Sequence, residues 1–529
     1  MTSPIDPDLR TSVDRETAHA CAQPTRRNIL SGTIGGMAAV GGLAAVTLSG
    51  SAQAQSASSA ASGAHLATPA KRDLLVTLVQ RTSQGYTRAL HQEARSRGFD
   101  SYLEWQLKPD LIDDSAMDAM LATYATLTMT SKQLWDAYGP PANNNTPVFE
   151  LRDATILRSL YSERQLFEVM VEFWADHFNT YAAAGPLPFL KTAEDRDVIR
   201  ANALGKFRDL LTADAKSASM LFYLNNNTNI AKAPNENYSR EVLELHTLGV
   251  DGPYFEQDVR ELARCFTGWT FFPPQHPNFG DFVFFAANHD TDEKNLLSQI
   301  VPAGGGVSDG EFMLDFLAAH PSTAEFLSRK LARYLLAYEP PQAIVDTVTA
   351  TYLATDGDIK EMIRAILTPQ NLQAPGEWQQ PKLKRPRRFV TGLMRSTGAF
   401  AQAGSLLAVV RRIDAMGQPT MLWETPDGFP DDLDTWGSTV LPRWEFATQL
   451  VGNSVLGVTL TGQMLLALLN GTPVQDAARA ISHALSGGTM SLYDVERVQA
   501  YIDAAPTFNL QVLREGFALA ASSPSYQYY

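Results

Sequence analysis

Apolar residues recur at intervals of three and four along most of the sequence, and this spacing constrains the fold more than any other feature. Such a repeat places apolar side chains on one side of an α-helix. Clusters of Pro, Gly and Asn interrupt the repeat and separate its segments. The clearest segments are Asp73 to Leu90, Ser115 to Tyr138, Ala154 to Phe178, Ala193 to Thr212, Asn235 to Leu248 and Glu256 to Phe266. The sequence therefore predicts a mainly α-helical protein.

A short stretch after residue 268 has a different pattern. Thr270 to Phe272 and Asp281 to Phe285 are rich in aromatic residues and flank a Pro-rich loop, which predicts a small β-hairpin near residues 270–286. With 529 residues, 45% of them apolar, the chain can bury a large core. We expect one large helical body that can form two lobes, over 71–269 and 307–529, with a hairpin and loop insertion over 270–306.

Residues 1–54 have the features of an export signal. Arg26 and Arg27 precede a weakly apolar run rich in Gly and Ala, from Ser31 to Gly50, and Ala52-Gln53-Ala54 matches a small-x-small cleavage site. This pattern predicts a twin-arginine signal peptide and a mature chain in the periplasm or outside the cell. Residues 55–70 are rich in Ala and Ser and are expected to be a disordered lead-in. We expect no integral membrane span in the mature chain.

The net charge of −14 argues against a nucleic acid or an anionic membrane surface as the partner. The single strongly basic run, Lys382 to Arg388, is interpreted as a solvated entry to a helix, although it could hold an anion. Of the two cysteines, Cys21 lies in the predicted signal, so Cys265 is left alone and no internal disulfide is expected.

The helix expected around Phe167 to Phe178 has two different sides. With a step of ~100° per residue, Glu168, Glu172 and Asp176 form one acidic stripe, which we expect to face solvent. His177 falls in the middle of the opposite, apolar side. A buried imidazole needs either a hydrogen-bond partner or a ligand, because leaving it unpaired is costly. A carbonyl or carboxylate partner and a metal-binding or catalytic role both stay open.

The segment from Pro234 to Val250, PNENYSREVLELHTLGV, concentrates polar groups on a second helix. On a straight α-helix, Glu241 and Glu244 share one side and His246 points away from both, so one ion cannot bind all three. The segment is therefore expected to present a glutamate face and a histidine face. Polar groups on a buried helix need partners from elsewhere in the fold.

Two sets of partners are possible. Arg260 and Arg264, four residues apart on the next helix, can pair with Glu241 and Glu244 in an ion network. Alternatively, one carboxylate joins His177, or His246 joins His289 and Asp290. Either of those combinations could bind a divalent cation or form an acid–base pair.

Several motifs resemble a bacterial family known as domain of unknown function 1800. They include FWADHF, the NENYSRE…ELHTLGV block, HPSTAEFLSRKLARYLL and the terminal ASSPSYQ. The resemblance implies a mostly helical exported protein. It also implies a neighbouring gene for a second twin-arginine protein, of the unknown-function family 1501, whose members look like sulfatase or alkaline-phosphatase relatives. Family members often have Gly-Trp-Pro where this chain has Gly428-Phe429-Pro430. The motif positions that carry over as candidates are His177, Asn235, Glu236, Asn237, Arg240, Glu241, Glu244, His246, His289 and Asp290.

Two functions follow as hypotheses. The favoured one is a partner or maturation factor for a co-exported phosphatase- or sulfatase-like protein, because no complete catalytic motif is present. The alternative is a metal- or acid/base-dependent enzyme whose cleft is roofed by the loop from Met416 to Pro442. Its catalytic candidates are His177, Glu241, Glu244 and His246, and its candidate ligands for a divalent metal are His177, His246, His289 and Asp290.

Overall fold

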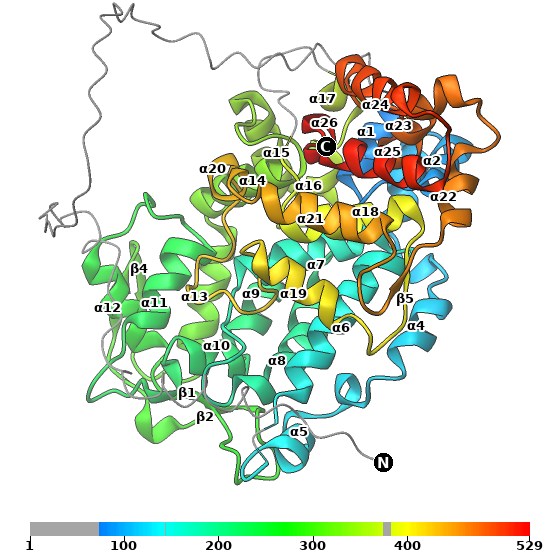
Figure 1. Cartoon of the computed structure of the whole chain (residues 1–529). Coiled ribbons are helices and arrows are strands. Elements are labelled where there is room, and N and C mark those ends of the chain that lie inside the picture. The colour runs from blue at the N-terminus through cyan, green and yellow to red at the C-terminus, as the bar shows by residue number, and fades with distance from the viewer. Residues whose placement is uncertain (1–72, 143, 374–381) are drawn as a thin grey trace, which may run out of the picture. The chain divides into compact units, whose positions relative to one another are not determined.

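The computed structural model describes residues 73–142, 144–373 and 382–529, all within one compact unit (Figure 1). The predicted signal peptide and lead-in lie outside these residues. Helices dominate the described part, which confirms the mainly α-helical prediction. In that part, no helix is both long and apolar enough to cross a bilayer. The proposed division into two lobes stays a prediction.

The first half of the described chain is a series of mostly short helices. They are α1 Leu74–Arg81, α2 Arg88–Arg97, α3 Phe99–Gln106, α4 Ser115–Leu121, α5 Ser131–Tyr138, α6 Thr146–Tyr161, α7 Gln165–His177, α8 Lys191–Ala193, α9 Phe207–Ala215, α10 Ala218–Tyr223, α11 Asn237–Glu241 and α12 Glu256–Cys265. Several expected helices are therefore split in two, and others are shorter than the apolar pattern suggests.

After two small hairpins, helices continue to the end of the chain. They are α13 Ser308–Ala319, α14 Pro321–Leu335, α15 Gln342–Thr355, α16 Ile359–Ile366, α17 Pro369–Gln373, α18 Pro386–Thr397, α19 Leu407–Ala415, α20 Leu433–Gly437, α21 Val440–Val451, α22 Gly462–Leu469, α23 Ala477–Ser486, α24 Leu492–Ala504, α25 Leu510–Ser522 and α26 Pro524–Gln527.

The predicted hairpin near residues 270–286 is present. It consists of β1 Trp269–Phe271 and β2 Phe282–Phe284, which pair antiparallel. Two further antiparallel pairs were not predicted: β3 Lys294–Leu296 with β4 Gln299–Val301, and β5 Phe400–Ala401 with β6 Val458–Thr459. These strands have only two or three residues each, too few for a period-two pattern to stand out in the sequence.

Two helices continue as π-helices, in which backbone hydrogen bonds span one more residue than in an α-helix. Segment η6, Glu194–Arg200, follows α8, and segment η8, Val242–His246, follows α11. The wider turn changes the angle between successive side chains. The faces expected for a straight α-helix therefore do not carry over to residues 242–246.

The helix expected from Asp73 to Leu90 is broken because its middle crosses another helix at close range. Gly85, in the link between α1 and α2, lies against Gly392 of α18, where a Cβ on Gly85 would come within 2.3 Å of the Gly392 Cα. Gln84 in the same link donates a hydrogen bond from Nε2 to Glu172 of α7, at 2.8 Å. The link therefore connects α18 with α7.

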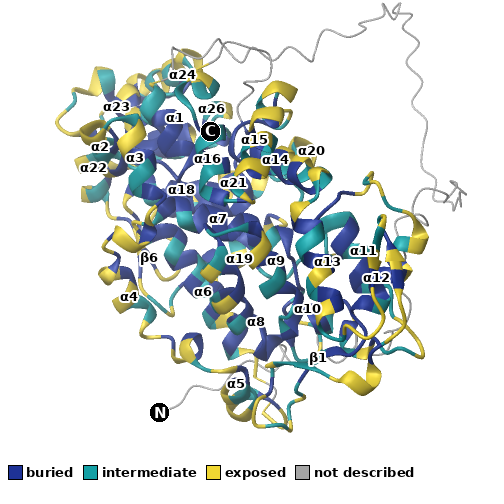
Figure 2. Cartoon of the chain, turned by 180° about the vertical axis from the view of Figure 1, so that it is seen from behind, coloured by how far each residue is buried: buried dark blue, intermediate teal, exposed yellow. Residues whose placement is uncertain are grey.

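The apolar core has two large clusters, and α7 and α18 belong to different ones. The first cluster contains α7 together with residues from α1 to α3 and from α9 to α16. The second contains α18 together with residues from α4, α6, α19 and the helices from α21 to α26. Figure 2 shows α7 and α18 as mostly buried neighbours. The helices α7 and α18 thus lie where the two clusters meet.

The crossing at Gly85 yields a stability prediction. Gly85→Ala is expected to lower the free energy of unfolding by about 1–3 kcal/mol, because the new methyl group has no space beside Gly392. Gly437→Ala is the matched control, since no atom lies within 4 Å of its added Cβ, and a change within about 0.5 kcal/mol is expected there. Chemical denaturation measures both variants. Equal effects at the two sites would contradict the close crossing.

Candidate functional site

The acidic stripe of α7 is buried rather than solvent-facing. Glu168 and Glu172 are only 6% and 7% exposed, and Asp176 is partly buried. The basic run is buried as well, although it was interpreted as solvated: Lys382, Lys384, Arg385, Arg387 and Arg388 are each less than a tenth exposed. Both expectations are wrong for one reason. Each charge has a partner inside the fold, and two of the pairs join the stripe to the basic run, because paired charges can leave water together.

Direct ion pairs join the acidic stripe to the start of α18. The guanidinium of Arg387 lies 2.6 Å from Glu172 Oε2, and Arg385 Nη1 lies 2.6 Å from Asp176 Oδ2. Glu168 pairs instead with Arg200 of η6, whose Nη1 donates at 3.1 Å. The Glu172 carboxylate also accepts the hydrogen bond from Gln84. These contacts fix both ends of the stripe.

The same basic residues hold in place the segment from Met416 to Pro442, a loop that contains α20 and ends in the first turn of α21. Lys382 Nζ lies 2.6 Å from Asp431 Oδ2, and Arg385 lies 3.6 Å from the other oxygen of that carboxylate. At Gly428, with φ of +70°, a Cβ would approach the Asp176 carbonyl oxygen to 2.0 Å. Only a glycine fits this crossing without displacing the backbone. The loop therefore covers the C-terminal end of α7.

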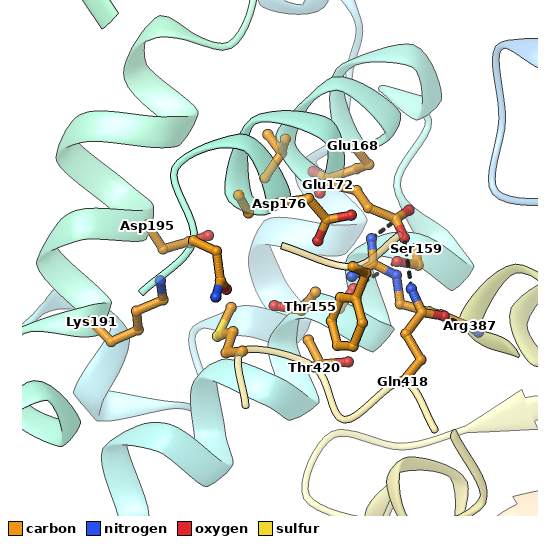
Figure 3. Close-up of a pocket in the computed structure, with 15 residues that line it drawn as sticks. Thr155, Ser159, Glu168, Glu172, Asp176, Lys191, Asp195, Arg387, Gln418 and Thr420 are labelled. Carbon is orange, nitrogen blue, oxygen red and sulfur yellow. Dashed lines mark hydrogen bonds and ion pairs between the residues drawn. The ribbon is translucent and has the colours of Figure 1, made fainter. Parts of the chain in front are cut away.

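A narrow cavity of about 40 Å³ lies between α7 and this loop (Figure 3). Since one water needs ~10–15 Å³ on this measure, the cavity has room for about three waters. Its walls come from α6, α7, α8, η6, α18 and the loop. The lining residues are Thr155, Ser159, Glu168, Val171, Glu172, Ala175, Asp176, Asn179, Lys191, Asp195, Arg387, Gln418, Thr420, Met421 and Phe429. We call this space the α7 cavity.

Glu172 and Asp176 have different protonation behaviour although they are one turn apart. Burial raises the pKa of Asp176 to about 6, and the pairing with Arg385 only partly opposes this. Burial also acts to raise the pKa of Glu172, but Arg387, Arg385 and the Gln84 hydrogen bond outweigh it, so that the pKa lies below its ordinary value. Near neutral pH, Glu172 is ionised while Asp176 can still gain or lose a proton.

His177 has a carbonyl partner and lies beside His246. Its Nε2 donates to the His246 backbone oxygen at 3.1 Å, and its Nδ1 lies 2.9 Å from Lys330 Nζ of α14. The two imidazole centroids are 6.0 Å apart, and both side chains are fully buried. Burial lowers the pKa of both, to about 3 for His246. Within the described part of the chain, neither ring nitrogen of His246 has a hydrogen-bond partner.

His289 and Asp290 take part in a separate network near β3. His289 Nδ1 donates to the Thr267 carbonyl at 2.8 Å, and its Nε2 lies 3.1 Å from Asp309 Oδ2. Lys294 Nζ donates to the same Asp309 oxygen at 2.7 Å. Asp290 pairs with Arg264, with 2.7 Å between Oδ2 and Nε. The histidine and aspartate after the hairpin thus secure β3 against α12 and α13.

Ion pairs between arginines and glutamates join α11 to α12. Arg240 lies 2.7 Å from Glu256 and 3.8 Å from Glu244, and Arg260 lies 3.6 Å from Glu236. Arg264 pairs with Glu261 and Asp290. Glu241 is the last residue of α11 and is partly buried.

Asn235 stabilises the first turn of α11. Its Oδ1 accepts the backbone N–H of Asn237 at 3.1 Å, and its own N–H donates to Asn229 Oδ1 at 2.9 Å. These contacts explain Asn235 by local structure.

The candidate metal ligands are thus divided between two places, His177 with His246 and His289 with Asp290. Over residues 73–142, 144–373 and 382–529, no three His, Cys, Asp or Glu side chains gather so that they could hold a metal ion. Both ring nitrogens of His177 already face polar atoms of the protein.

One known protein family matches most of the chain. A family described as protein of unknown function (DUF1800) matches residues 77–528. The chain belongs to this family. No curated protein and no solved structure matches it. The resemblance seen in the motifs is confirmed, and this DUF1800 chain adds to them an acidic cavity on α7.

Sequence reasoning missed several residues of this DUF1800 site. Arg387 and Gln418 line the α7 cavity, and Lys330 contacts His177. One signal for Lys330 was available, because it is a single lysine with Phe326 and Tyr334 four residues away on either side of it. Such a position lies on the apolar side of a helix.

The Arg387–Glu172 pair generates a second stability prediction. Arg387→Met is expected to lower the free energy of unfolding by about 3–5 kcal/mol, because it leaves a buried carboxylate without its main partner. The double variant with Glu172→Gln is expected to recover much of the loss. Arg329→Met removes an exposed pair with Glu325 and should cost at most about 1 kcal/mol. Denaturant titration of the four proteins measures these differences.

The Arg387–Glu172 pair also predicts how the free energy of unfolding depends on pH. The lowered pKa of Glu172 contributes stability above the ordinary glutamate pKa of 4.5. This contribution is lost as the pH falls through the lower pKa of the folded state. The Glu172→Gln variant should therefore lose less stability on acidification than the natural protein. An equal loss in both would show that Glu172 is not held ionised by Arg387.

Proposed function

We propose that the α7 cavity is the acid–base centre of an exported enzyme. The observation that carries the proposal is the pair of carboxyl groups, Glu172 and Asp176, one turn apart in the cavity wall with their pKa values moved in opposite directions. Groups separated in this way can divide the roles of proton donor and charge holder in one reaction.

Each wall of the cavity supports a part of this chemistry. Asp176, with a pKa of about 6, donates or accepts the proton near neutral pH. Arg387 supplies positive charge where a substrate oxygen becomes negative, whereas the Lys191 amine is already paired with Glu194. Thr155 and Thr420 add hydroxyl groups that can orient a polar group. Glu172 stays ionised and holds Arg387 in position.

The size of the cavity limits what can react there. A space of about 40 Å³ admits a hydroxyl, carbonyl or amide group, or the water that attacks one, but no large molecule. We therefore propose that the substrate inserts one small polar group and that the rest of it stays outside, against the loop from Met416 to Pro442.

A partner or maturation role for a co-exported protein of family 1501 is the second candidate. It is supported by large apolar side chains that are exposed on two helices packed against α25. Leu441 and Trp444 of α21 are 63% and 46% exposed, and Leu492 and Tyr493 of α24 are 67% and 58% exposed. Exposed apolar residues on a folded protein are suited to binding another protein.

Asp176→Asn tests the acid–base centre. A panel of chromogenic esters, amides, phosphates, sulfates and glycosides first identifies a substrate between pH 5 and 8. On that substrate the variant is expected to lose about 10²-fold or more in kcat/KM, because the proton donor is gone. The natural protein should have a pH–rate limb near 6, which matches the Asp176 pKa.

The surface variant Asp315→Asn is the control for that experiment, since Asp315 pairs with Arg208 outside the cavity. Thermal unfolding of both variants establishes that they fold. Full activity in Asp176→Asn, or an Asp176 carboxyl that titrates near pH 4 by NMR, contradicts the proposal. Absence of turnover on the whole panel together with such a low titration leaves the partner role.

Export and partnership can be tested in one set of cells. The chain is expected in the periplasm with an N-terminus near Gln55, whereas the variant with both Arg26→Lys and Arg27→Lys should stay in the cytoplasm. Crosslinking in the periplasm should capture a second exported protein, and Leu441→Ser with Trp444→Ser should abolish that product. A natural chain that is found in the cytoplasm contradicts the export proposal.

A further inference from the structure

Two uncharged side chains in the wall of the α7 cavity, Thr155 and Asn179, have already used their donor hydrogens. Thr155 donates its hydroxyl hydrogen to the Leu151 carbonyl at 2.8 Å. Asn179 Nδ2 donates its two hydrogens to two carbonyls of the loop, those of Trp423 and Thr425, at 3.0 and 2.8 Å. A hydroxyl lone pair and the amide oxygen Oδ1 are what these side chains still offer, and both can only accept.

Asp195 of the π-helix η6 adds a carboxylate to the same wall. The residue is 5% exposed and lines the cavity. Its nearest ionic partner in the described chain is Arg158, whose Nη1 lies 3.7 Å from Oδ2, too far for a hydrogen bond. Arg158 Nη1 has no hydrogen-bond partner in that part of the chain either. The Asp195 carboxylate therefore has lone pairs left for a group inside the cavity.

The other carboxylates in the wall are compensated at shorter distances. Glu172 and Asp176 each have an arginine nitrogen at 2.6 Å, and Glu168 accepts a hydrogen bond from an arginine at 3.1 Å. A buried carboxylate is stabilised by donors in direct contact with it. Among these four acids, Asp195 is thus the one whose negative charge is least satisfied by the protein.

The two ends of the cavity have opposite character. Figure 3 shows Asp195 and Lys191 on one side and Arg387 on the other. The Lys191 amine does not compensate Asp195, because its Nζ lies 2.6 Å from both Glu194 Oε1 and Thr180 Oγ1. One end therefore supplies a donor with positive charge, and the other supplies acceptors with negative charge.

We propose that the Asp195 end of the α7 cavity binds the protonated primary amine of a substrate. An ammonium group has three N–H donors and one positive charge. Asp195, Asn179 Oδ1 and Thr155 Oγ1 offer it three acceptors, one of them charged. A cavity of about 40 Å³ has room for this group and little more. The amine and the oxygen that reacts at Arg387 must therefore lie on neighbouring carbons, as in an amino sugar or an amino alcohol.

An amine can reach this end from the surface. The wall residues Ala175 and Met421 are partly exposed, so the cavity opens between α7 and the loop. The inference rests on the proposed function for its link to a reaction, since it names the class of substrate for the same cavity. Binding of the ammonium group itself needs no proton transfer, so it can be measured without turnover.

Methylammonium chloride is the probe that tests the inference, and Met421 is the reporter in the cavity wall. The protein is labelled with ¹³C at its methionine methyl groups, and Met421→Leu assigns the signal. NMR follows that signal during a titration at neutral pH and constant ionic strength. We expect a saturable shift with a Kd in the millimolar range, about the limit for so small a ligand. Tetramethylammonium has no N–H donor and should bind about tenfold or more weakly.

Two aspartates of η6 provide the variant and its matched control. Asp195→Asn removes the negative charge and should weaken methylammonium binding about tenfold or more. Asp197→Asn changes an exposed carboxylate that pairs with Arg196, and it should leave the Kd unchanged. If Asp195→Asn does not fold, the comparison of the two cations on the natural protein decides.

Three results would overturn the proposal: no saturable shift from methylammonium, equal shifts from both cations, or an unchanged Kd in Asp195→Asn. Methylammonium binding that depends on Asp195, together with no turnover of any substrate, would overturn the proposed function alone. Turnover that depends on Asp176, without methylammonium binding, would overturn this inference alone.

Discussion

The compensation of buried charges between α7 and the start of α18 is the interaction on which the rest of the structure depends. Glu172 and Asp176 belong to a helix of one apolar cluster, and Arg387 and Arg385 begin a helix of the other. Neither set can leave water without the other, because an unpaired buried charge costs several kcal/mol. The pairing therefore joins the two clusters, and the link at Gln84 and the loop at Asp431 contact the same charges.

The α7 cavity is a result of this arrangement. Ion pairs need particular distances and angles, and side chains that satisfy them cannot also fill space as freely as leucines do. A small polar gap is left between the acidic stripe, Gln418 and the loop. Most charges around the cavity are ion-paired. For the Asp176 carboxyl group, burial raises the pKa more than the pairing with Arg385 lowers it. Because its pKa is raised to about 6, Asp176 can exchange a proton near neutral pH. The ion pairs around it, whose charges are balanced, stabilise the fold.

The sequence predicted what depends on periodicity and missed what depends on contacts between distant segments. The helical class and the hairpin near residues 270–286 follow from local spacing, and both are present. The break at Gly85 and the burial of the acidic stripe depend on α18, more than 200 residues away, which no local pattern reveals. For His177, the sequence correctly required a partner, but only the fold could supply the His246 carbonyl. Residues 242–246 form a π-helix. The assignment of their side chains to two helix faces, which assumed an α-helix throughout, therefore does not hold.

The backbone and the side chain of His246 have different surroundings. Its main chain sets the tautomer of His177, and its imidazole, fully buried, faces its surroundings without a hydrogen-bond partner in the described chain. Replacing the side chain leaves the peptide oxygen in place, and only a change in the course of the helix removes it. The backbone at this position therefore orients His177 whichever side chain residue 246 carries.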